Sequence, residues 1–118
     1  MTPYLTDPDV TLYCGDALEV LRTLPDRSVD ACVTSPPYLD ARPEYPSPTL
    51  SHFEDIFRQL GRVVTGPFLL NVGRIWRGGS ERLWWIDLLQ RADWAGWQLR
   101  DTLIWVKPNA NPIHGEIL

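Results

Sequence analysis

Long hydrophobic runs are missing from this chain of 118 residues. No stretch approaches the about 18 consecutive apolar residues that a membrane-spanning helix needs, and no signal peptide begins the sequence. We therefore expect a cytoplasmic protein that has no membrane partner.

Cysteine is also scarce, with two residues, Cys14 and Cys32, in hydrophobic segments that look like strands. They form no C-x-x-C pair. Neither His52 nor His114 has the spacing of a metal ligand, so we expect both to be structural or solvent-facing. These features argue against a disulfide framework and against a metal site. We predict two reduced cysteines in the core and no bound metal.

Lysine is nearly absent, since Lys107 is the only one, beside ten arginines. The net charge of −4 is unlike that of an autonomous nucleic-acid binder, which usually shows a basic face. A local arginine cluster within an acidic chain remains compatible with nucleic acid. Hydrophobic residues make up 44% and charged residues 22%, which is ordinary for a globular protein. We predict one domain over residues 1–118.

Strand-like and helix-like patterns alternate along the chain. The predicted strands cover 10–16, 29–35, 66–73 and 97–108, and the last of these is either one strand or two strands separated by a bend near Asp101. The predicted helices cover 17–24 with Asp16 as N-cap, a stretch that begins at a capping box Ser51–Glu54, and a stretch from Ser80 to about Ala92. A proline-rich loop over 36–49 and a loop over 75–79 connect these elements.

This alternation predicts an α/β protein with a mostly parallel, Rossmann-like sheet and helices on both faces. Ligands of such sheets bind at the carboxyl ends of the strands. Three predicted strands end in polar or proline residues, at Gly15-Asp16, at 35–38 and at 71–73. We expect these ends to share one edge of the sheet.

The end of the second strand reads Ser35-Pro36-Pro37-Tyr38. Prolines have no N–H group, so this rigid turn leaves the carbonyls of Ser35 and Pro36 free as acceptors. With a hydroxyl and an aromatic face added, the set suits a planar group that bears an amino donor, such as a nucleobase. The alternative from these four residues alone is a proline turn that merely ends a strand.

Two longer stretches carry a resemblance to a known family. "TSPPY" (34–38), preceded by "GDALEVLRTLPDRSVDACV", resembles the target-base motif of amino-group DNA methyltransferases of the permuted class. "LIWVKPNANP" (103–112) resembles a segment that follows in the same class. The resemblance implies S-adenosylmethionine-dependent methylation of an exocyclic base amine in double-stranded DNA. The serine form of the motif leans toward cytosine N4 rather than adenine N6.

The resemblance also implies roles for the residues of this turn. Ser35 and Pro36 would hold the target amine beside the cofactor, Pro37 would keep the turn rigid, and Tyr38 would stack on a flipped base. Asp16 would lie near the adenosine end of the cofactor, and its alternative role is the helix N-cap.

Further residues have weaker roles implied by the same resemblance. Lys107 and Asn109 would contact DNA, although a solvated lysine explains the first as well. Asn71 and Gly73 could line the same cleft or could simply form a turn.

One feature of the family is missing, because the chain contains no G-x-G sequence for the methionine end of the cofactor. We therefore expect the amino-terminal catalytic part of such an enzyme, with an incomplete sheet. Three accounts fit: a fragment or split enzyme completed by a second chain that carries the glycine-rich motif, an enzyme completed by self-association, or a non-catalytic module that binds DNA or a partner. An incomplete sheet leaves an open edge, which favours pairing with another chain.

Overall fold

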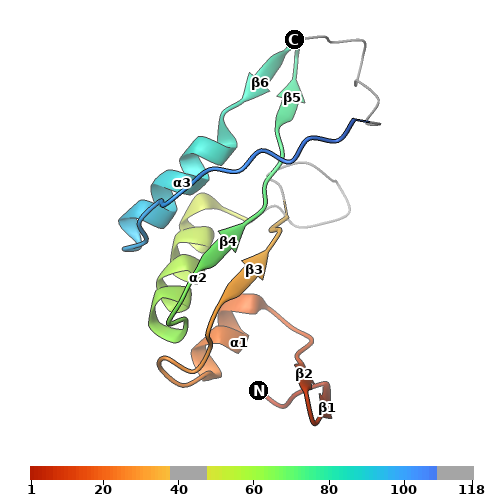
Figure 1. Cartoon of the computed structure of the whole chain (residues 1–118), viewed down its shortest axis with the longest axis vertical. Coiled ribbons are helices and arrows are strands. Elements are labelled where there is room, and N and C mark those ends of the chain that lie inside the picture. Colours follow the sequence, from red (N-terminus) through yellow and green to blue (C-terminus); the bar gives the residue numbers. More distant parts are fainter. Residues whose placement is uncertain (38–47, 109–118) are drawn as a thin grey trace.

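The computed structural model describes residues 1–37 and 48–108, which form three helices and three two-stranded sheets (Figure 1). In chain order the elements are β1 (Leu5–Asp7), β2 (Val10–Leu12), α1 (Ala17–Thr23), β3 (Cys32–Thr34), α2 (Leu50–Val63), β4 (Phe68–Leu70), β5 (Ile75–Arg77), β6 (Ser80–Arg82) and α3 (Trp84–Trp94). The α/β class predicted from the sequence is confirmed.

β3 and β4 form the one parallel pair in the described part of the chain, with Cys32 opposite Phe68 and Thr34 opposite Leu70. α2 connects them, so this stretch is a β-α-β unit. The chain enters β4 at Gly66, where a Cβ atom would overlap the carbonyl oxygen of Asp30. Glycine is needed there because the two backbones approach so closely.

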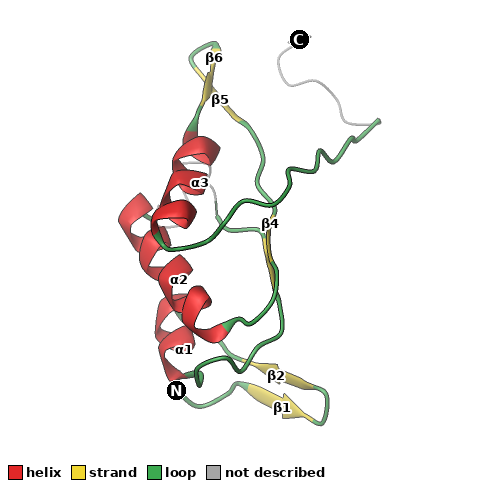
Figure 2. Ribbon diagram, turned by 60° about the vertical axis from the view of Figure 1, so that its left-hand side comes forward, coloured by secondary structure: helices red, strands yellow, loops and turns green. Residues whose placement is uncertain are grey.

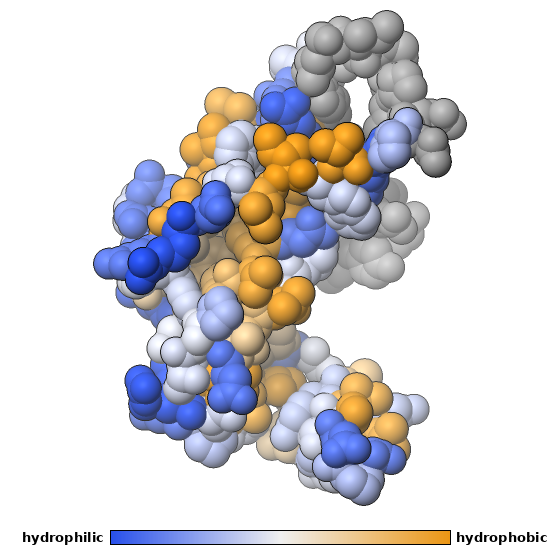
Figure 3. Space-filling model, viewed as in Figure 1, coloured by the Kyte–Doolittle hydropathy of each residue, from blue (hydrophilic) through white to orange (hydrophobic). Residues whose placement is uncertain are grey.

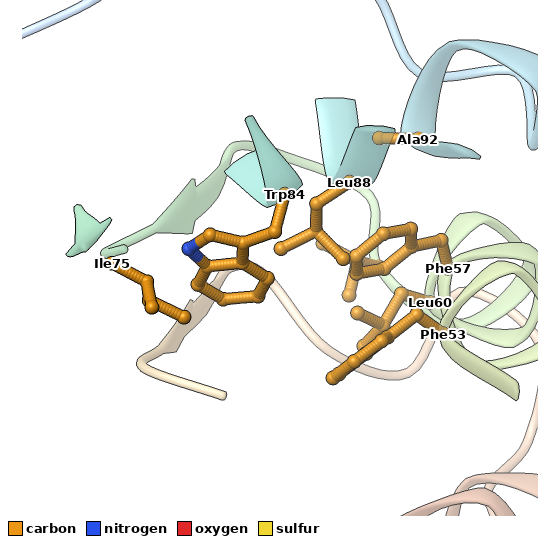
Figure 4. Packing of buried hydrophobic residues seen from close by; sticks show 8 residues of the cluster. Phe53, Phe57, Leu60, Ile75, Trp84, Leu88 and Ala92 are labelled. Carbon is orange, nitrogen blue, oxygen red and sulfur yellow. The ribbon is translucent and has the colours of Figure 1, made fainter. Parts of the chain in front are cut away.

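The core lies between α2 and α3 (Figure 4). α2 presents apolar side chains at helical spacing, and Phe53, Phe57 and Leu60 are each less than a tenth exposed. Figure 4 shows them facing Trp84 and Leu88 of α3. Burial of such side chains stabilises by about 1.5–3 kcal/mol each, so this contact holds the two helices together.

β4 joins this core through one face only. The ring of Phe68 lies 5.5 Å from that of Phe57 and 5.1 Å from that of Trp97, centroid to centroid. Side chains alternate between the two faces of a strand, so Val33 and Leu69 point the other way and are 77% and 48% exposed. Figure 2 shows the helices together on one side of β4. The prediction of helices on both faces is therefore wrong for the described residues.

The prediction of a mostly parallel sheet is also wrong for the described residues, because two of the three strand pairs are antiparallel. The segment 10–16 was expected to be a parallel strand, yet only β2 is extended, and it pairs with β1. The intervening Asp7-Pro8-Asp9 turn folds the chain back on itself. The predicted loop over 75–79 is likewise a strand and a turn, since β5 pairs with β6 around Gly78 and Gly79.

The predicted strand over 97–108 does not form. Trp97 is anchored by a hydrogen bond of 2.9 Å from its Nε1 to the carbonyl of Phe57. Residues 98–108 carry no regular secondary structure, and all are exposed. A strand needs a neighbour for its backbone groups, and within the described residues this segment pairs with none.

The helix starts agree with the sequence prediction for α1 only. The Asp16 carboxylate accepts a hydrogen bond of 3.1 Å from the Glu19 N–H, so the predicted N-cap is confirmed. α2 is capped by Thr49, not by Ser51, because the Thr49 hydroxyl accepts from the His52 N–H at 3.0 Å. Ser80 belongs to β6 rather than capping α3, which begins at Trp84 with no side-chain cap.

Arg62 connects α2 to the end of α1. Its guanidinium donates to the carbonyls of Leu21 (2.8 Å) and Leu24 (2.9 Å) and pairs with Asp26. A helix leaves its last carbonyls without intrahelical partners, so Arg62 supplies donors that α1 lacks. In residues 1–37 and 48–108, no helix has the length and apolar character that crossing a membrane requires.

Arg62→Met should lower the free energy of unfolding by about 1–3 kcal/mol, because the two carbonyls of α1 lose charged donors. Urea denaturation measures this change. Arg58→Met is the matched control, since Arg58 makes an exposed i,i+4 pair with Glu54 that is worth about 0.3–0.5 kcal/mol. Equal losses in the two variants would contradict this role of Arg62.

Asp16→Ala should lower the free energy of unfolding by about 1 kcal/mol, because α1 loses its N-cap acceptor. Asp16→Asn should cost much less, since the amide oxygen can accept the same hydrogen bond. Thermal unfolding followed by circular dichroism compares the two variants. If Asn destabilised as much as Ala, the carboxylate charge rather than the cap would be what matters.

Candidate functional site

The carboxyl ends of β3 and β4 lie side by side. The two strands are parallel, and the Asn71 N–H donates to the Thr34 carbonyl at 2.9 Å just past the last paired residues. Ser35 and Asn71 therefore leave the sheet next to each other, and Figure 1 shows the ends of β3 and β4 side by side. Two of the three predicted strand ends do share one edge.

The turn after β3 presents acceptors at this edge. Ser35 and Pro37 are exposed and Pro36 is half-buried. Neither proline has an N–H to donate, and no group of the described residues donates to the carbonyls of Ser35 or Pro36. The turn thus offers a hydroxyl and two carbonyl oxygens to an outside donor.

Asp16 reaches this edge by a different route from the one predicted. β2 does not pair with β3, so no shared sheet brings Asp16 to it. Its carboxylate instead lies 3.6 Å from Nε2 of His52, in the first turn of α2. α2 connects two parallel strands and therefore runs antiparallel to them, so its amino end lies at their carboxyl edge. Asp16 is half exposed there while it also caps α1.

His52 was expected to be structural or solvent-facing, and the structure brings it to Asp16. The sequence contained one usable signal, which was a helix start near residue 50. With the cap placed at Thr49 rather than Ser51, His52 falls in the first turn, at the end of α2 that faces the site.

Asn71 and Gly73 differ in their surroundings. The Gly73 carbonyl accepts a hydrogen bond of 3.0 Å from Trp84 Nε1, so this residue serves the packing of α3. Asn71 is exposed, and its backbone N–H makes the bond to Thr34 described above. Asn71 is therefore the one of the two that is exposed at the carboxyl end of β4 and bonded through its backbone to the end of β3.

The remaining predicted residues are not brought to this edge by any described contact. Lys107 lies on the exposed segment after α3, with its Nζ 4.4 Å from the centroid of the Trp105 ring. Tyr38 and Asn109 lie outside the described residues. The roles predicted for all three stay predictions.

The two cysteines are both free but differ in burial. Cys32 lies on the inner face of β3 against the core, and desolvation raises the pKa of its thiol. Its predicted place beside the core is confirmed, whereas Cys14 is exposed because the sheet does not extend to it. Across residues 1–37 and 48–108, no three His, Cys, Asp or Glu side chains are placed to hold a metal ion.

Known proteins resemble this chain over most of its length. Type II methyltransferase M.SfiI of Streptomyces fimbriatus is 34% identical over 89% of this chain and 32% of its own length. The corresponding values are 31%, 86% and 48% for type II methyltransferase M.XycI of Xanthomonas campestris pv. cyanopsidis. They are 28%, 93% and 36% for type II methyltransferase M.PvuII of Proteus hauseri.

No family model matches the chain, and no solved structure matches it. The chain spans between about a third and a half of the length of the three relatives named above. Nearly all of this chain, including the β3–β4 edge, is therefore similar to one part of type II methyltransferases.

Proposed function

We propose that this chain forms the target-base part of a DNA methyltransferase that methylates an exocyclic base amine, cytosine N4 more readily than adenine N6. The observation that carries the proposal is the Ser35-Pro36-Pro37 turn, which stands with open acceptors at the carboxyl edge of a parallel strand pair. The similarity to type II methyltransferases supports the reaction class.

The turn suits the chemistry of an amine. The lone pair of an exocyclic amine is delocalised into the base, so the nitrogen is a weak nucleophile. Acceptors at Ser35 Oγ and the Pro36 carbonyl would bind both amine hydrogens and favour a pyramidal nitrogen. Ser35 Oγ and the Pro36 carbonyl would keep this nitrogen oriented toward the methyl group that the cofactor would supply, and the proton that the nitrogen loses would leave to solvent. The nitrogen and the methyl carbon would have to lie about 3–3.5 Å apart, and this positioning would supply most of the rate enhancement.

S-adenosylmethionine would supply the methyl group as an electrophile when bound. Asp16, Ser35 and Pro36 are the residues we propose to hold it, because all three border the β3–β4 edge. An exposed carboxylate and free carbonyls fit the hydroxyl and amino donors of such a cofactor. The fit is partial, since the sequence contains no G-x-G turn for its methionine end.

Double-stranded DNA is the proposed substrate, and the target base must leave the helix to reach the turn. Tyr38 would stack on the flipped base, and Lys107 and Asn109 would contact DNA nearby. A role in restriction, in self-protection or in regulation is compatible with this reaction.

The complete enzyme would have a Rossmann-like sheet, to which this chain contributes β3 and β4. Their outer face is uncovered, with Val33 77% and Leu69 48% exposed. The segment after α3 adds Leu103, Ile104 and Trp105, each more than 70% exposed. Figure 3 shows apolar side chains gathered over this face. We propose that a second copy, or a complementing chain with the glycine-rich motif, covers it.

A second candidate function is a non-catalytic module that binds DNA or a partner chain. It is favoured by one observation, which is that the chain matches less than half of M.SfiI and M.XycI and has no G-x-G turn.

Ser35→Ala should reduce transfer of labelled methyl from S-adenosylmethionine to DNA by about 10²-fold, the scale for loss of one preorganised hydrogen-bonding group. Tyr38→Ala should reduce it as well. The assay is run on the full chain alone and together with the protein encoded by the neighbouring reading frame, which is the candidate for the complementing chain. Ser51→Ala is the matched control, because Ser51 is an exposed serine of α2 that does not cap the helix.

Transfer that survives Ser35→Ala unchanged would refute the role of the turn. Binding of S-adenosylmethionine by calorimetry with no transfer under either condition would favour the non-catalytic module. Asp16→Asn tests the cofactor role separately, since it keeps an N-cap acceptor and removes only the charge. It should weaken the binding of S-adenosylmethionine measured by calorimetry.

Leu69→Ser should weaken association of the chain, because it removes apolar surface from the uncovered face. Sedimentation velocity of the unsubstituted chain should give a mass above the monomer's 13.5 kDa, alone or with the neighbouring product. Leu12→Ser is the matched control, since Leu12 is similarly exposed on β2. A monomer under both conditions, with a closed sheet by solution scattering, would contradict the proposal.

A further inference from the structure

The hairpin formed by β5 and β6 projects from the body of the molecule beyond α3 (Figures 1 and 2). Its two strands are joined by Gly78 and Gly79, whose φ angles are +60° and +79°. Positive φ at both positions is what a tight two-residue hairpin turn requires. A Cβ atom at either glycine would meet nothing within 4 Å among the described residues, so neither glycine is packed against the body of the protein.

The base of the hairpin is firmly held. Ile75 is only 8% exposed and belongs to the core cluster. Glu81 accepts from Trp85 Nε1 at 3.1 Å and pairs with Arg74 at 3.2 Å. These contacts anchor the two strands to α3 and to each other. A hairpin with a fixed base and an open tip is a preorganised surface feature rather than a loose loop.

The hairpin carries the opposite charge from the chain as a whole. Residues 74–82 contain three arginines and one glutamate, within a chain of net charge −4. Arg82 is exposed at the end of β6, and the side chain of Arg74 is 56% exposed despite its pair with Glu81. This is a local basic element of the kind that an otherwise acidic nucleic-acid enzyme would need.

The location of the hairpin matches that of the candidate site. β5 begins four residues after Asn71, which is bonded to the end of β3. The chain therefore passes from the carboxyl edge of β3 and β4 directly into the hairpin (Figure 1). A duplex whose base entered the Ser35 turn would have its backbone on this side of the molecule.

We infer that the β5–β6 hairpin contacts the phosphates of duplex DNA, with Arg82 as one phosphate ligand. The inference rests on the proposed function for its choice of DNA. A two-stranded ribbon is narrow enough to enter a major groove, and an arginine at the end of a strand, as Arg82 is, can meet phosphates at the groove edge. Contacts of this kind hold the DNA in place without reading its sequence.

The test measures binding of the full chain to a labelled DNA duplex of arbitrary sequence by fluorescence anisotropy over a series of salt concentrations. One lost phosphate contact lowers the slope of log affinity against log salt by about 0.9. Arg82→Gln should lower the slope by that amount and weaken binding by about eightfold at 0.1 M salt. Arg82→Lys should retain the slope because it keeps the charge.

Arg22→Gln is the matched control, since it removes the same charge from an exposed arginine in the last turn of α1. The last turn of α1 lies at the end of the β-α-β unit opposite to the hairpin. The Arg22→Gln chain should therefore keep the slope of the unsubstituted chain. Circular dichroism melting of all three variants confirms that each is folded.

An unchanged slope in Arg82→Gln, an equal loss in Arg22→Gln, or no duplex binding by the unsubstituted chain would each overturn the inference. None of these outcomes depends on methyl transfer. Loss of transfer in Ser35→Ala with a normal salt slope would leave the hairpin and the reaction separately supported. An Arg82→Gln chain with a normal slope and normal transfer would refute the hairpin alone.

Discussion

The parallel pairing of β3 with β4 determines where the proline turn, Asn71 and the first turn of α2 lie. It brings the end of β3, with its proline turn, beside the end of β4 through the Asn71–Thr34 hydrogen bond. It also forces α2 to run back against the strands, so that His52 and its neighbour Asp16 lie at the same end. The hairpin inferred to contact DNA begins where β4 ends, so its position depends on the same pairing.

This pairing is stabilised from one side only. Phe68 packs into the aromatic contacts of the core with Phe57 and Trp97, while the opposite face of the strands carries Val33 and Leu69 in solvent. A parallel sheet is normally covered on both faces, because its strands are apolar on both. The described residues leave the other face uncovered, and the chain corresponds to a third to a half of the length of the three relatives.

In the proposed function, the absence of donors in the proline turn would serve the chemistry. Most strand ends present N–H groups together with carbonyls, and a bound amine would then meet donors as well as acceptors. Two consecutive prolines remove two N–H groups and leave Ser35 and Pro36 as acceptors at an exposed edge. In the proposed function, the rigid backbone would also reduce the conformational entropy lost when a base is held, as a reaction governed by positioning requires.

Local sequence determined a good part of this protein. The helical spacing of apolar residues in α2, the Asp16 cap of α1, and the strand segments around β3 and β4 were all predictable, because each depends on neighbours a few residues away. The proline turn itself was predictable for the same reason, and its chemistry stays a prediction. The cap of α2 at Thr49 was missed because two hydroxyl residues compete within three positions.

Tertiary structure alone decided the rest. The segment 10–16 has the composition of an inner strand, yet β2 pairs with β1, because a turn at Pro8 offers a partner at lower entropic cost. Residues 98–108 have strand composition too, and they stay exposed because the described residues supply no neighbouring strand. Strand composition is a local property, whereas a strand exists only where another backbone accepts its hydrogen bonds, and that partner can lie anywhere in the chain or outside it.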